Sequence, residues 1–241
     1  PKAEPPVPLD SKPEPKADQV IEMKLLTIAI PTFNRVNELK RLLAIIASER
    51  AQIDGFDSLC DVLVLDNGTT WQEDDMFSFR PEWNFISYIR HKVNIGPDAN
   101  IRACYSKSNS KYAWILGDDD FPRYGLISRV ITTLEDQEPD LLYIRAFWCS
   151  PEKSEKKFDS FGLLPDNIAQ KINPEILALR YGSALMFISS VITNKSKFAK
   201  ANINIDSLAN TSLSHLCWTL PLLSSNNKIL FIKIPAILAT A

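Results

Sequence analysis

Residues 25–35 read LLTIAIPTFNR, and they predict a strand that leads directly into a helix. The first six residues are almost all apolar and include β-branched side chains, which is typical of a parallel strand buried on both faces. Pro31 is expected to end that strand, and Asn34 is expected to cap the helix that follows. The apolar residues of this helix recur at helical spacing, at Leu39, Leu42, Leu43 and Ile46.

The same alternation of apolar strands and amphipathic helices continues through the first half of the chain. The predicted strands are Val62–Leu65, Phe85–Ile89, Tyr112–Leu116 and Leu141–Phe147, and the predicted helices are Asp98–Ser106 and about Tyr124–Leu134. This order predicts an α/β fold with a mostly parallel central sheet and helices on both faces. Ligands of such sheets bind at the carboxyl ends of the strands, so the loops after Ile30, Leu65 and Leu116 are the informative ones.

The second half is less regular, and the N-terminal stretch differs from both halves. Residues 149–172 are polar and irregular; after them the pattern predicts a helix at Pro174–Tyr181, a strand near Leu185–Ile192, a helix at about Ser212–Leu223 and a strand at Ile229–Ile234. Residues 1–22 hold six of the sixteen prolines, interleaved with charged residues. Such a segment buries too little surface to offset its ordering entropy, so we expect a disordered proline-rich tail or linker before one domain at 23–241.

The composition excludes several classes of protein and site. A formal net charge of −2 and a pI near 5.8 provide no basic field for a nucleic acid. No apolar run reaches the roughly 18–20 residues of a transmembrane segment. The four cysteines are far apart and form no CxxC pair, which indicates reduced thiols in a reducing compartment. Neither GxGxxG nor GxxxxGK occurs, so the sequence has no dinucleotide fingerprint and no P-loop.

Three adjacent carboxylates, Asp118-Asp119-Asp120, follow the predicted strand Tyr112–Leu116. Like charges this close repel one another, and a divalent cation would relieve the repulsion. Mg²⁺ and Mn²⁺ prefer carboxylate and water oxygens, and substrate phosphates often complete their coordination. The alternative is that the acids only cap the following helix and favour its positive end. One or two acids would suffice for that, so three in a row favour a metal site.

Two further loops carry polar groups that suit a nucleotide. After the first strand, Thr32 offers hydrogen bonds, Phe33 a ring face and Arg35 a cation for a diphosphate. After the second strand, Asp66 can accept a hydrogen bond from a base or from a ribose hydroxyl. Taken alone, each of these loops and the turn that starts at Asn94 is also explained as an ordinary turn or helix cap.

In combination these stretches resemble the family-2-type glycosyltransferases with the GT-A fold, which is Rossmann-like. IPTFNR, LDNGTT, NIG and ILGDDD occupy the positions of four motifs of that family, in the same order and at plausible spacing. The resemblance covers roughly Leu25 to Phe147. The last motif looks particularly like that of transferases that add sugars to bacterial O-antigen-type surface glycans. The resemblance implies a nucleotide-binding half at 23–148 and an acceptor-side half at 149–241.

The resemblance also implies roles for the matching residues. Those expected to bind the nucleotide sugar are Pro31, Thr32, Phe33, Arg35, Asp66, Asn94 and Asp118. Asp66 would contact the nucleoside, and Asp118 would face the ribose or the sugar. Asp119 and Asp120 would lie nearest to a Mn²⁺ or Mg²⁺ ion, with Asp118 as a third metal ligand.

The implied reaction is metal-dependent transfer of a sugar from a nucleotide-sugar donor to a hydroxyl of a glycan or lipid-linked glycan, with inversion at the anomeric carbon. Such a protein is expected in the cytoplasm, or as a peripheral protein at the inner face of a membrane. The Q-x-x-R-W motif of processive synthases does not occur, so the addition of single sugars is expected.

One departure from the family pattern concerns the catalytic base. Family members often carry a Glu-Asp pair on a later helix, but the corresponding stretch, Leu213–Trp218, contains no acid. The base is therefore His215, Asp206 or a residue that the sequence does not identify, and the alternative for His215 is an ordinary histidine on a helix surface. Two other functions stay open: a GT-A-like binding module that has lost catalysis, and a sugar nucleotidyltransferase. The latter normally has a Gly-rich loop after its first strand, which IPTFNR is not.

Overall fold

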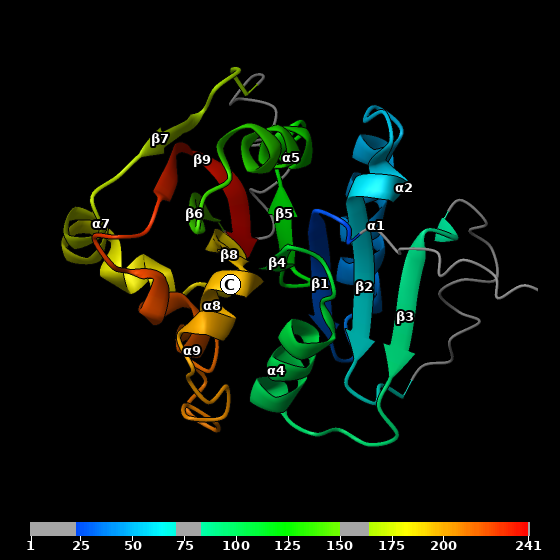
Figure 1. Ribbon diagram of the computed structural model, residues 1–241. Coiled ribbons are helices and arrows are strands. Elements are labelled where there is room, and N and C mark those ends of the chain that lie inside the picture. The colour runs from blue at the N-terminus through cyan, green and yellow to red at the C-terminus, as the bar shows by residue number, and fades with distance from the viewer. Residues whose placement is uncertain (1–22, 71–82, 150–163, 241) are drawn as a thin grey trace, which may run out of the picture.

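The computed structural model of the protein describes residues 23–70, 83–149 and 164–240. One sheet runs through this part of the chain in the order β3-β2-β1-β4-β8-β6-β9-β5, with β7 paired to β9 (Figure 1). The strands are β1 (Leu26–Thr32), β2 (Cys60–Asp66), β3 (Ile86–Arg90), β4 (Tyr112–Ile115), β5 (Asp120–Pro122), β6 (Leu141–Cys149), β7 (Ala169–Lys171), β8 (Val191–Asn194) and β9 (Ile229–Thr240). The α-helices are α1 (Val36–Arg50), α2 (Phe56–Leu59), α4 (Pro97–Lys107), α5 (Leu126–Gln137), α7 (Pro174–Tyr181), α8 (Lys195–Lys200) and α9 (Leu216–Thr219). Three 3₁₀ turns complete the described elements: η2 (Gly182–Met186), η3 (Ile188–Ser190) and η4 (Leu220–Leu222).

The strands β1, β2, β3 and β4 are parallel to one another, as predicted. β1 lies between β2 and β4 and pairs in parallel with both, and β3 extends the sheet beside β2. β8 is antiparallel to both β4 and β6, so β4 and β6 point the same way. The carboxyl ends of β1, β2, β4 and β6 therefore lie along one edge of a mixed, mostly parallel α/β sheet.

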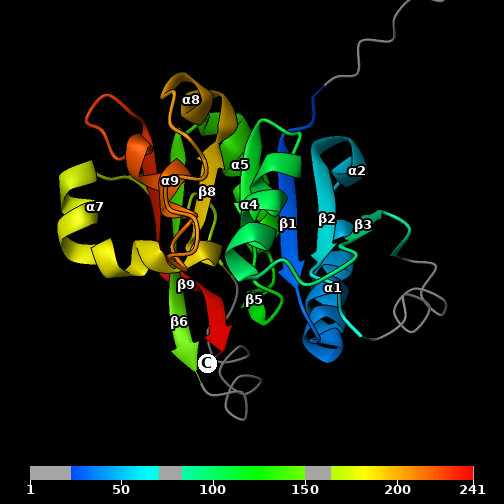
Figure 2. The same cartoon turned by 90° about the horizontal axis from the view of Figure 1, so that it is seen from below.

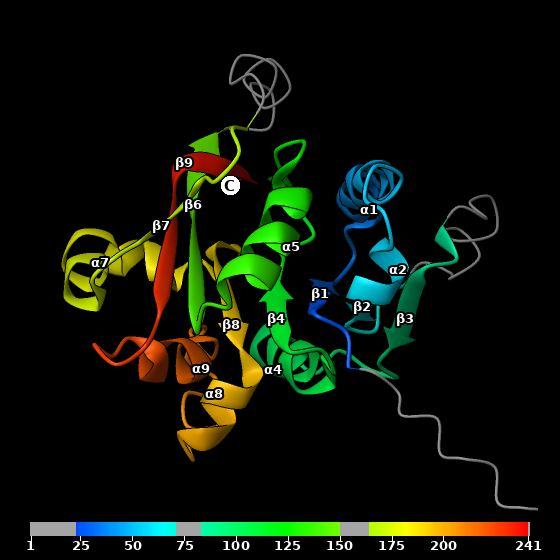
Figure 3. The ribbon, with the colours of Figure 1, turned by 45° about the horizontal axis from the view of Figure 1, so that its top comes forward.

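Helices cover both faces of the sheet. Figure 2 and Figure 3 show α1 and α5 on one face and α4, α8 and α9 on the other. The side chains of β1 point alternately to the two faces of the sheet, as in any strand. Leu26, Ile28 and Ile30 pack with apolar residues of α1 and α5, whereas Ala29 packs with residues of α4 and α9. All four residues are fully buried, which explains why the strand is apolar along its length.

Two expectations about the first strand and helix are wrong in detail. Pro31 does not end β1, which continues to Thr32 and still pairs with β2 there. Pairing of β1 with β4 stops at Ala29. Strand β4 therefore offers no partner at Pro31, and the backbone N–H that proline lacks costs the sheet no hydrogen bond. Asn34 does not cap α1 either, because its backbone is left-handed, with φ of 55°, and Arg35 occupies the N-cap position. The Asn34 Oδ1 instead accepts a hydrogen bond of 3.1 Å from the Thr70 N–H, which ties the loops after β1 and β2 together.

The second half of the chain departs further from the prediction. Helix α7 has the predicted bounds, but the strand predicted near Leu185–Ile192 is replaced by η2 and η3 followed by β8. The helix predicted at Ser212–Leu223 is reduced to the short α9 and η4. The three-residue strands β5 and β7 were not predicted, and β9 continues past its predicted end at Ile234 to Thr240.

Other predictions have mixed outcomes. Cys60, Cys104 and Cys217 are buried free thiols, as predicted, whereas the side chain of Cys149 is outside the described part of the chain. None of the described helices has the length and apolar character needed to cross a membrane. The predicted tail at 1–22 lies outside the described residues and stays a prediction.

Candidate active site

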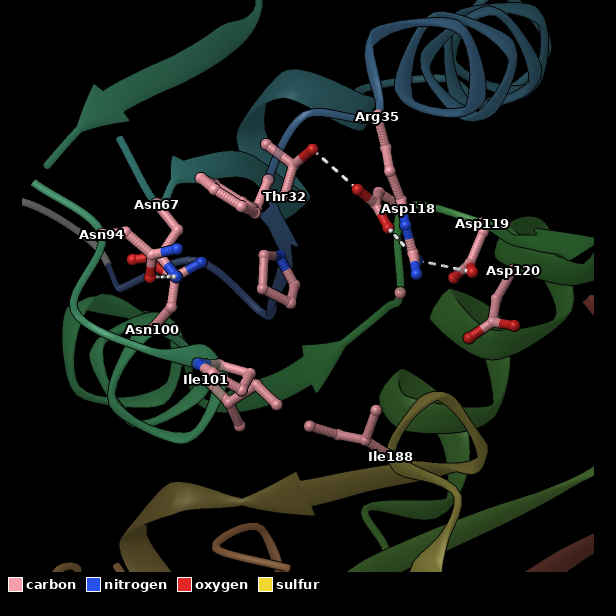
Figure 4. Close-up of a pocket in the computed structure, with 14 residues that line it drawn as sticks. Thr32, Arg35, Asn67, Asn94, Asn100, Ile101, Asp118, Asp119, Asp120 and Ile188 are labelled. Carbon is pink, nitrogen blue, oxygen red and sulfur yellow. Dashed lines mark hydrogen bonds and ion pairs between the residues drawn. The ribbon is translucent and has the colours of Figure 1, made fainter. Parts of the chain in front are cut away.

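A cavity of about 400 Å³ opens at the carboxyl edge of β1, β2 and β4. Its wall comes from the loops that follow these strands, from the start of α4 and from η3 (Figure 4). The lining residues are Pro31, Thr32, Phe33, Arg35, Asn67, Asn94, Pro97, Asn100, Ile101, Gly117, Asp118, Asp119, Asp120 and Ile188. The structure thus brings together every predicted site residue except Asp66, Asp206 and His215.

Asp118 and Asp119 meet the loop that follows β1 inside this cavity. The Asp118 Oδ2 accepts a hydrogen bond of 2.7 Å from the Thr32 hydroxyl. The Arg35 Nη1 lies 3.2 Å from the Asp118 Oδ1 and 2.6 Å from the Asp119 Oδ2, so one guanidinium bridges two acids (Figure 4). The end of β1 and the start of α1 therefore hold two of the three acids of Asp118–Asp120 (the acid triple), one through the Thr32 hydroxyl and both through the Arg35 charge.

Asp120 is fixed from the other side of the cavity, by η3. Its Oδ2 accepts a hydrogen bond of 2.6 Å from the Ser189 hydroxyl, and the Ser189 Oγ accepts one of 2.9 Å from the Gly117 N–H. A glycine at position 117 leaves the Asp120 carboxylate in place, because a Cβ there would lie 2.5 Å from the Asp120 Oδ2 and would displace it. The chain thus turns tightly before the triple and aims its carboxylates into the cavity.

The cavity concentrates negative charge that Arg35 offsets only in part. Burial raises the pKa of Asp118 to about 6, against the opposing effects of the Thr32 hydrogen bond and the Arg35 charge. Burial likewise raises the pKa of Asp120 to about 7, against the hydrogen bond from Ser189. Two desolvated carboxyl groups beside a third acid favour the approach of further positive charge.

Asparagine side chains build the opposite wall of the cavity, and only Asn94 among them was predicted. The Asn67 amide donates a hydrogen bond of 2.9 Å to the Asn94 Oδ1 and accepts one of 2.9 Å from the Ile95 N–H. The Asn100 amide donates one of 3.0 Å to the Leu65 carbonyl at the end of β2. Asn67 lies inside the LDNGTT motif, so its neighbour Asp66 could have pointed to it. Asn100 follows the NIG turn at the start of a predicted helix, where a turn and a helix cap explained it equally well.

Residues 27–194, well over half of the chain, match the family model described as glycosyl transferase family 2. The chain belongs to glycosyl transferase family 2. The abequosyltransferase RfbV of Salmonella typhimurium is 28% identical over 206 residues, which make up 80% of this chain and 59% of RfbV. The chain thus spans less than two thirds of this relative.

Solved structures confirm the GT-A fold predicted for this family 2 chain. The crystal structure of S. aureus TarS 1–349 matches it with a TM-score of 0.65 at 14% identity, over 90% of this chain and 60% of the TarS chain. The structure of the same TarS fragment in complex with UDP-GlcNAc matches with a TM-score of 0.61 at 13% identity, over 90% of this chain and 58% of that one.

In this family 2 chain Asp66 lies behind the cavity and does not line it. Asp66 is fully buried and accepts hydrogen bonds from the Thr69 N–H at 2.9 Å, the Thr69 hydroxyl at 2.6 Å, the Arg90 Nε at 2.7 Å and the Tyr88 hydroxyl. Burial alone would raise its pKa, but these hydrogen bonds outweigh burial and hold the pKa below its ordinary value. Contact between Asp66 and a nucleoside stays a prediction, and it requires Asp66 to exchange one of these partners.

Neither candidate base lines the cavity. His215 is buried, and its Nε2–H donates a hydrogen bond of 3.2 Å to the Leu185 carbonyl. Because the side chain is buried, the alternative of a helix-surface histidine is wrong. Burial also lowers the pKa of His215. The Asp206 side chain is 62% exposed and pairs with Arg102 at 2.9 Å. Among the described lining residues, the only side chains that could accept a proton as a base are the carboxylates of Asp118, Asp119 and Asp120.

The acid triple fits a divalent cation by its chemistry, although it is no preformed cage. Within the described ranges no group of three or more His, Cys, Asp or Glu residues is arranged to hold a metal ion by itself. Mg²⁺ sites commonly use one or two carboxylates and take their remaining oxygens from water and substrate phosphates. The three acids offer such oxygens, and the Arg35 guanidinium already lies where positive charge is required.

Proposed function

We propose that this chain transfers a sugar from a nucleotide-sugar donor to a hydroxyl of a glycan acceptor, with the help of Mn²⁺ or Mg²⁺. The observation that carries the proposal is the cavity in which the Arg35 loop faces three aspartates at the carboxyl edge of the sheet. The name of the relative RfbV, an abequosyltransferase, supports the reaction class. The complex of TarS with UDP-GlcNAc supports the donor class.

Each part of such a donor has a chemically matched group in the cavity. The Arg35 guanidinium can form paired hydrogen bonds with a diphosphate, which would release Asp118 and Asp119 for a cation. The Phe33 ring is 40% exposed and offers its face to a base. Asp119 and Asp120, with Asp118, would hold the cation, which when bound neutralises the charge of the departing diphosphate.

The proposed step is a displacement at the anomeric carbon with inversion. The acceptor oxygen forms its bond on one face of this carbon while the bond to the diphosphate oxygen breaks on the other. The nucleoside diphosphate leaves with the bonding electron pair, and the hydroxyl proton passes to a base. Neither His215 nor Asp206 lines the cavity, so either could serve as that base only after a movement that brings it to the acceptor hydroxyl.

We place the acceptor among bacterial surface glycans, free or lipid-linked, to which one sugar is added at a time. A lipid-linked acceptor would bring the protein to the cytoplasmic face of a membrane as a peripheral protein. The relative RfbV supports this assignment as a bacterial sugar transferase.

The direct test measures nucleoside diphosphate release from a panel of UDP-, GDP-, TDP- and CDP-sugars, with and without Mn²⁺. Release that requires the metal is expected. A nucleotidyltransferase would instead form a sugar nucleotide from a nucleoside triphosphate and a sugar phosphate, with release of inorganic diphosphate. A binding module that has lost catalysis would bind a donor and release nothing.

Substitutions in the triple test the metal assignment. Asp119→Asn and Asp120→Asn keep the side-chain size and remove one negative charge each, so we expect each to weaken Mn²⁺-dependent binding of the nucleoside diphosphate at least about tenfold, or about 1.4 kcal/mol. Asp136→Asn on the exposed surface of α5 is the matched control and should leave affinity unchanged. Isothermal titration calorimetry gives the affinities, and wild-type values in both site variants would contradict the assignment.

A further inference from the structure

A second cavity, of about 480 Å³, lies over the carboxyl half of β6 and is closed by α7, η2 and η3. Four aromatic side chains line it: Tyr143, Trp148, Tyr181 and Phe187. The Trp148 side chain is 60% exposed, and its ring lies 5.0 Å from that of Phe187, at an angle of 56°. An exposed tryptophan ring next to the partly buried Phe187 and Tyr181, inside a concavity, favours a ligand with its own apolar faces. A pyranose ring is such a ligand, because its C–H groups present a flat face and its hydroxyls point outward.

The cavity also carries one positive charge. Arg145 is exposed, and it makes no ion pair with any residue that the structure describes. No other charged side chain among the described residues lines this cavity. A guanidinium that no described carboxylate pairs with, next to aromatic rings, suits an anionic group that can accept two parallel hydrogen bonds, such as a phosphate or a carboxylate.

The two cavities are neighbours on the same edge of the sheet. β4 and β6 point the same way, so the acid triple after β4 and Trp148 near the end of β6 lie at the same edge. The turn η3 forms the wall between the cavities, because Ile188 lines the first and Phe187 and Ser190 line the second.

The wall between the cavities is anchored to the acid triple. The Ser189 hydroxyl donates a hydrogen bond to Asp120, and the Ser189 carbonyl accepts one of 2.8 Å from the Trp114 Nε1. A ligand in the second cavity would therefore sit beside the proposed donor site, held at a fixed distance by η3.

We propose that the second cavity binds the acceptor, and that this acceptor is an anionic carbohydrate. Its sugar ring stacks on Trp148 and Phe187, and its phosphate or carboxylate pairs with Arg145. The assignment of the ligand as the acceptor rests on the proposed function, whereas the binding of an anionic sugar does not.

The test uses hexose 1-phosphates (glucose, galactose and N-acetylglucosamine), the matching methyl glycosides, and farnesyl diphosphate as probes. Saturation-transfer difference NMR on the full chain should detect at least one hexose 1-phosphate and a weaker signal from its methyl glycoside. Trp148→Ala and Arg145→Gln should each weaken binding of that phosphate at least tenfold. Trp148→Phe should retain binding, since it keeps a ring. Tyr124→Ala is the matched control, because Tyr124 is a 56% exposed aromatic residue outside this cavity.

Three results would overturn the proposal. The first is that no hexose 1-phosphate binds, and the second is that Trp148→Ala and Arg145→Gln both bind it as tightly as the wild type does. The third is that UDP, GDP, TDP and CDP with Mn²⁺ displace the phosphosugar from the protein. Farnesyl diphosphate distinguishes the source of the anion. If it competes with the phosphosugar, the anionic group that pairs with Arg145 belongs to a lipid carrier. If it does not compete, that anionic group belongs to the glycan itself. Nucleotide-sugar turnover is measured separately from phosphosugar binding. A protein without turnover could therefore still bind the anionic sugar, and a protein with turnover could fail to bind it.

Discussion

The geometry of the acid triple is controlled by single residues on its two sides. Arg35 supplies a charge to Asp118 and Asp119, and Ser189 supplies a hydroxyl to Asp120. Gly117 contributes by having no side chain, since the space that a Cβ would fill is taken by the Asp120 carboxylate. Removing or adding a few atoms here should therefore alter binding more than folding.

Gly117→Ala tests this directly. The new methyl group would push the Asp120 carboxylate away from Ser189, so we expect the affinity for Mn²⁺ and nucleoside diphosphate to fall about tenfold. The cost in unfolding free energy should stay near 1 kcal/mol, because the displaced atom is the end of a side chain that can rotate. Calorimetry and thermal unfolding measure the two effects. Gly182→Ala is the control, since a Cβ at Gly182 meets nothing within 4 Å, and equal affinities in both variants would refute the prediction.

The sequence identified the charged part of the site better than its neutral part. Asp118–Asp120 stand out in the sequence because three adjacent acids after an apolar strand repel one another unless positive charge offsets them. Arg35 stands out as a cation in the loop after the first strand. Asn100, Ile188 and Ser189 line or support the same cavity, but each is ordinary in its local context and becomes part of the site only through tertiary packing. His215 was singled out for its chemistry, and the fold directs its imidazole to a backbone carbonyl instead.

Among the secondary-structure elements, α1 and α5 are joined by a buried carboxylate. Helix α5 has Gly125 at its N-cap and therefore no side-chain cap of its own. The Glu49 carboxylate of α1 accepts hydrogen bonds from the Gly125 N–H at 2.8 Å and the Ser128 N–H at 3.2 Å, so one helix caps the other. Burial raises the pKa of Glu49 from 4.5 to about 7, although these hydrogen bonds oppose the shift.

This contact should make stability depend on pH. A carboxyl whose pKa is raised in the folded state adds stability below its unfolded pKa, near 4.5, and loses that contribution as the pH rises through about 7. Between pH 6 and pH 8 the wild type should therefore lose roughly 1 kcal/mol more unfolding free energy than Glu49→Gln, which cannot ionise. Urea denaturation at the two pH values measures the difference. Glu135→Gln, at an exposed position of α5, should follow the wild type, and a Glu49→Gln slope equal to the wild type's would contradict the prediction.

Element length decided which parts of the fold could be predicted. The parallel strands and α1 carry long apolar patterns with one period, and their existence and order were predicted correctly. The region that holds η2, η3, α9 and η4 consists of pieces of three to five residues, too short to show a period. Their conformation depends on tertiary packing, of η2 and η3 against β6 and of α9 against β8 and α4, so a single strand and a single helix were predicted where several short turns occur.

At the scale of the whole molecule, β8 connects the parallel strands of the first half of the sheet to β6 and β9. This strand lies antiparallel between β4 and β6, and thereby brings residues of β6 and η3 to the same edge as the acid triple. The family motifs end near Phe147 and give no indication of this connection. The cavity at the acid triple could therefore be predicted from the sequence, whereas the cavity beside it depends on long-range strand pairing.

The described chain is tied into the sheet from Lys24 onward, which bears on the role of residues 1–22. The Lys24 Nζ pairs with Asp61 at 2.7 Å, the Lys24 carbonyl accepts a hydrogen bond from the Lys111 N–H at 2.9 Å, and Leu26 is fully buried. Met23, by contrast, is 58% exposed.

A chain that starts at Met23 should therefore unfold at the same temperature as the full chain, because residues 1–22 have too few apolar side chains to support a core. A chain that starts at Thr27 is the control. It loses the Lys24 contacts and the buried Leu26, so its unfolding free energy should fall by about 2–5 kcal/mol and its melting temperature by at least about 4 °C. Differential scanning calorimetry compares the three proteins. A drop of several degrees already at the Met23 start would show that residues 1–22 pack against the domain, and the proposed tail would then be part of the folded unit.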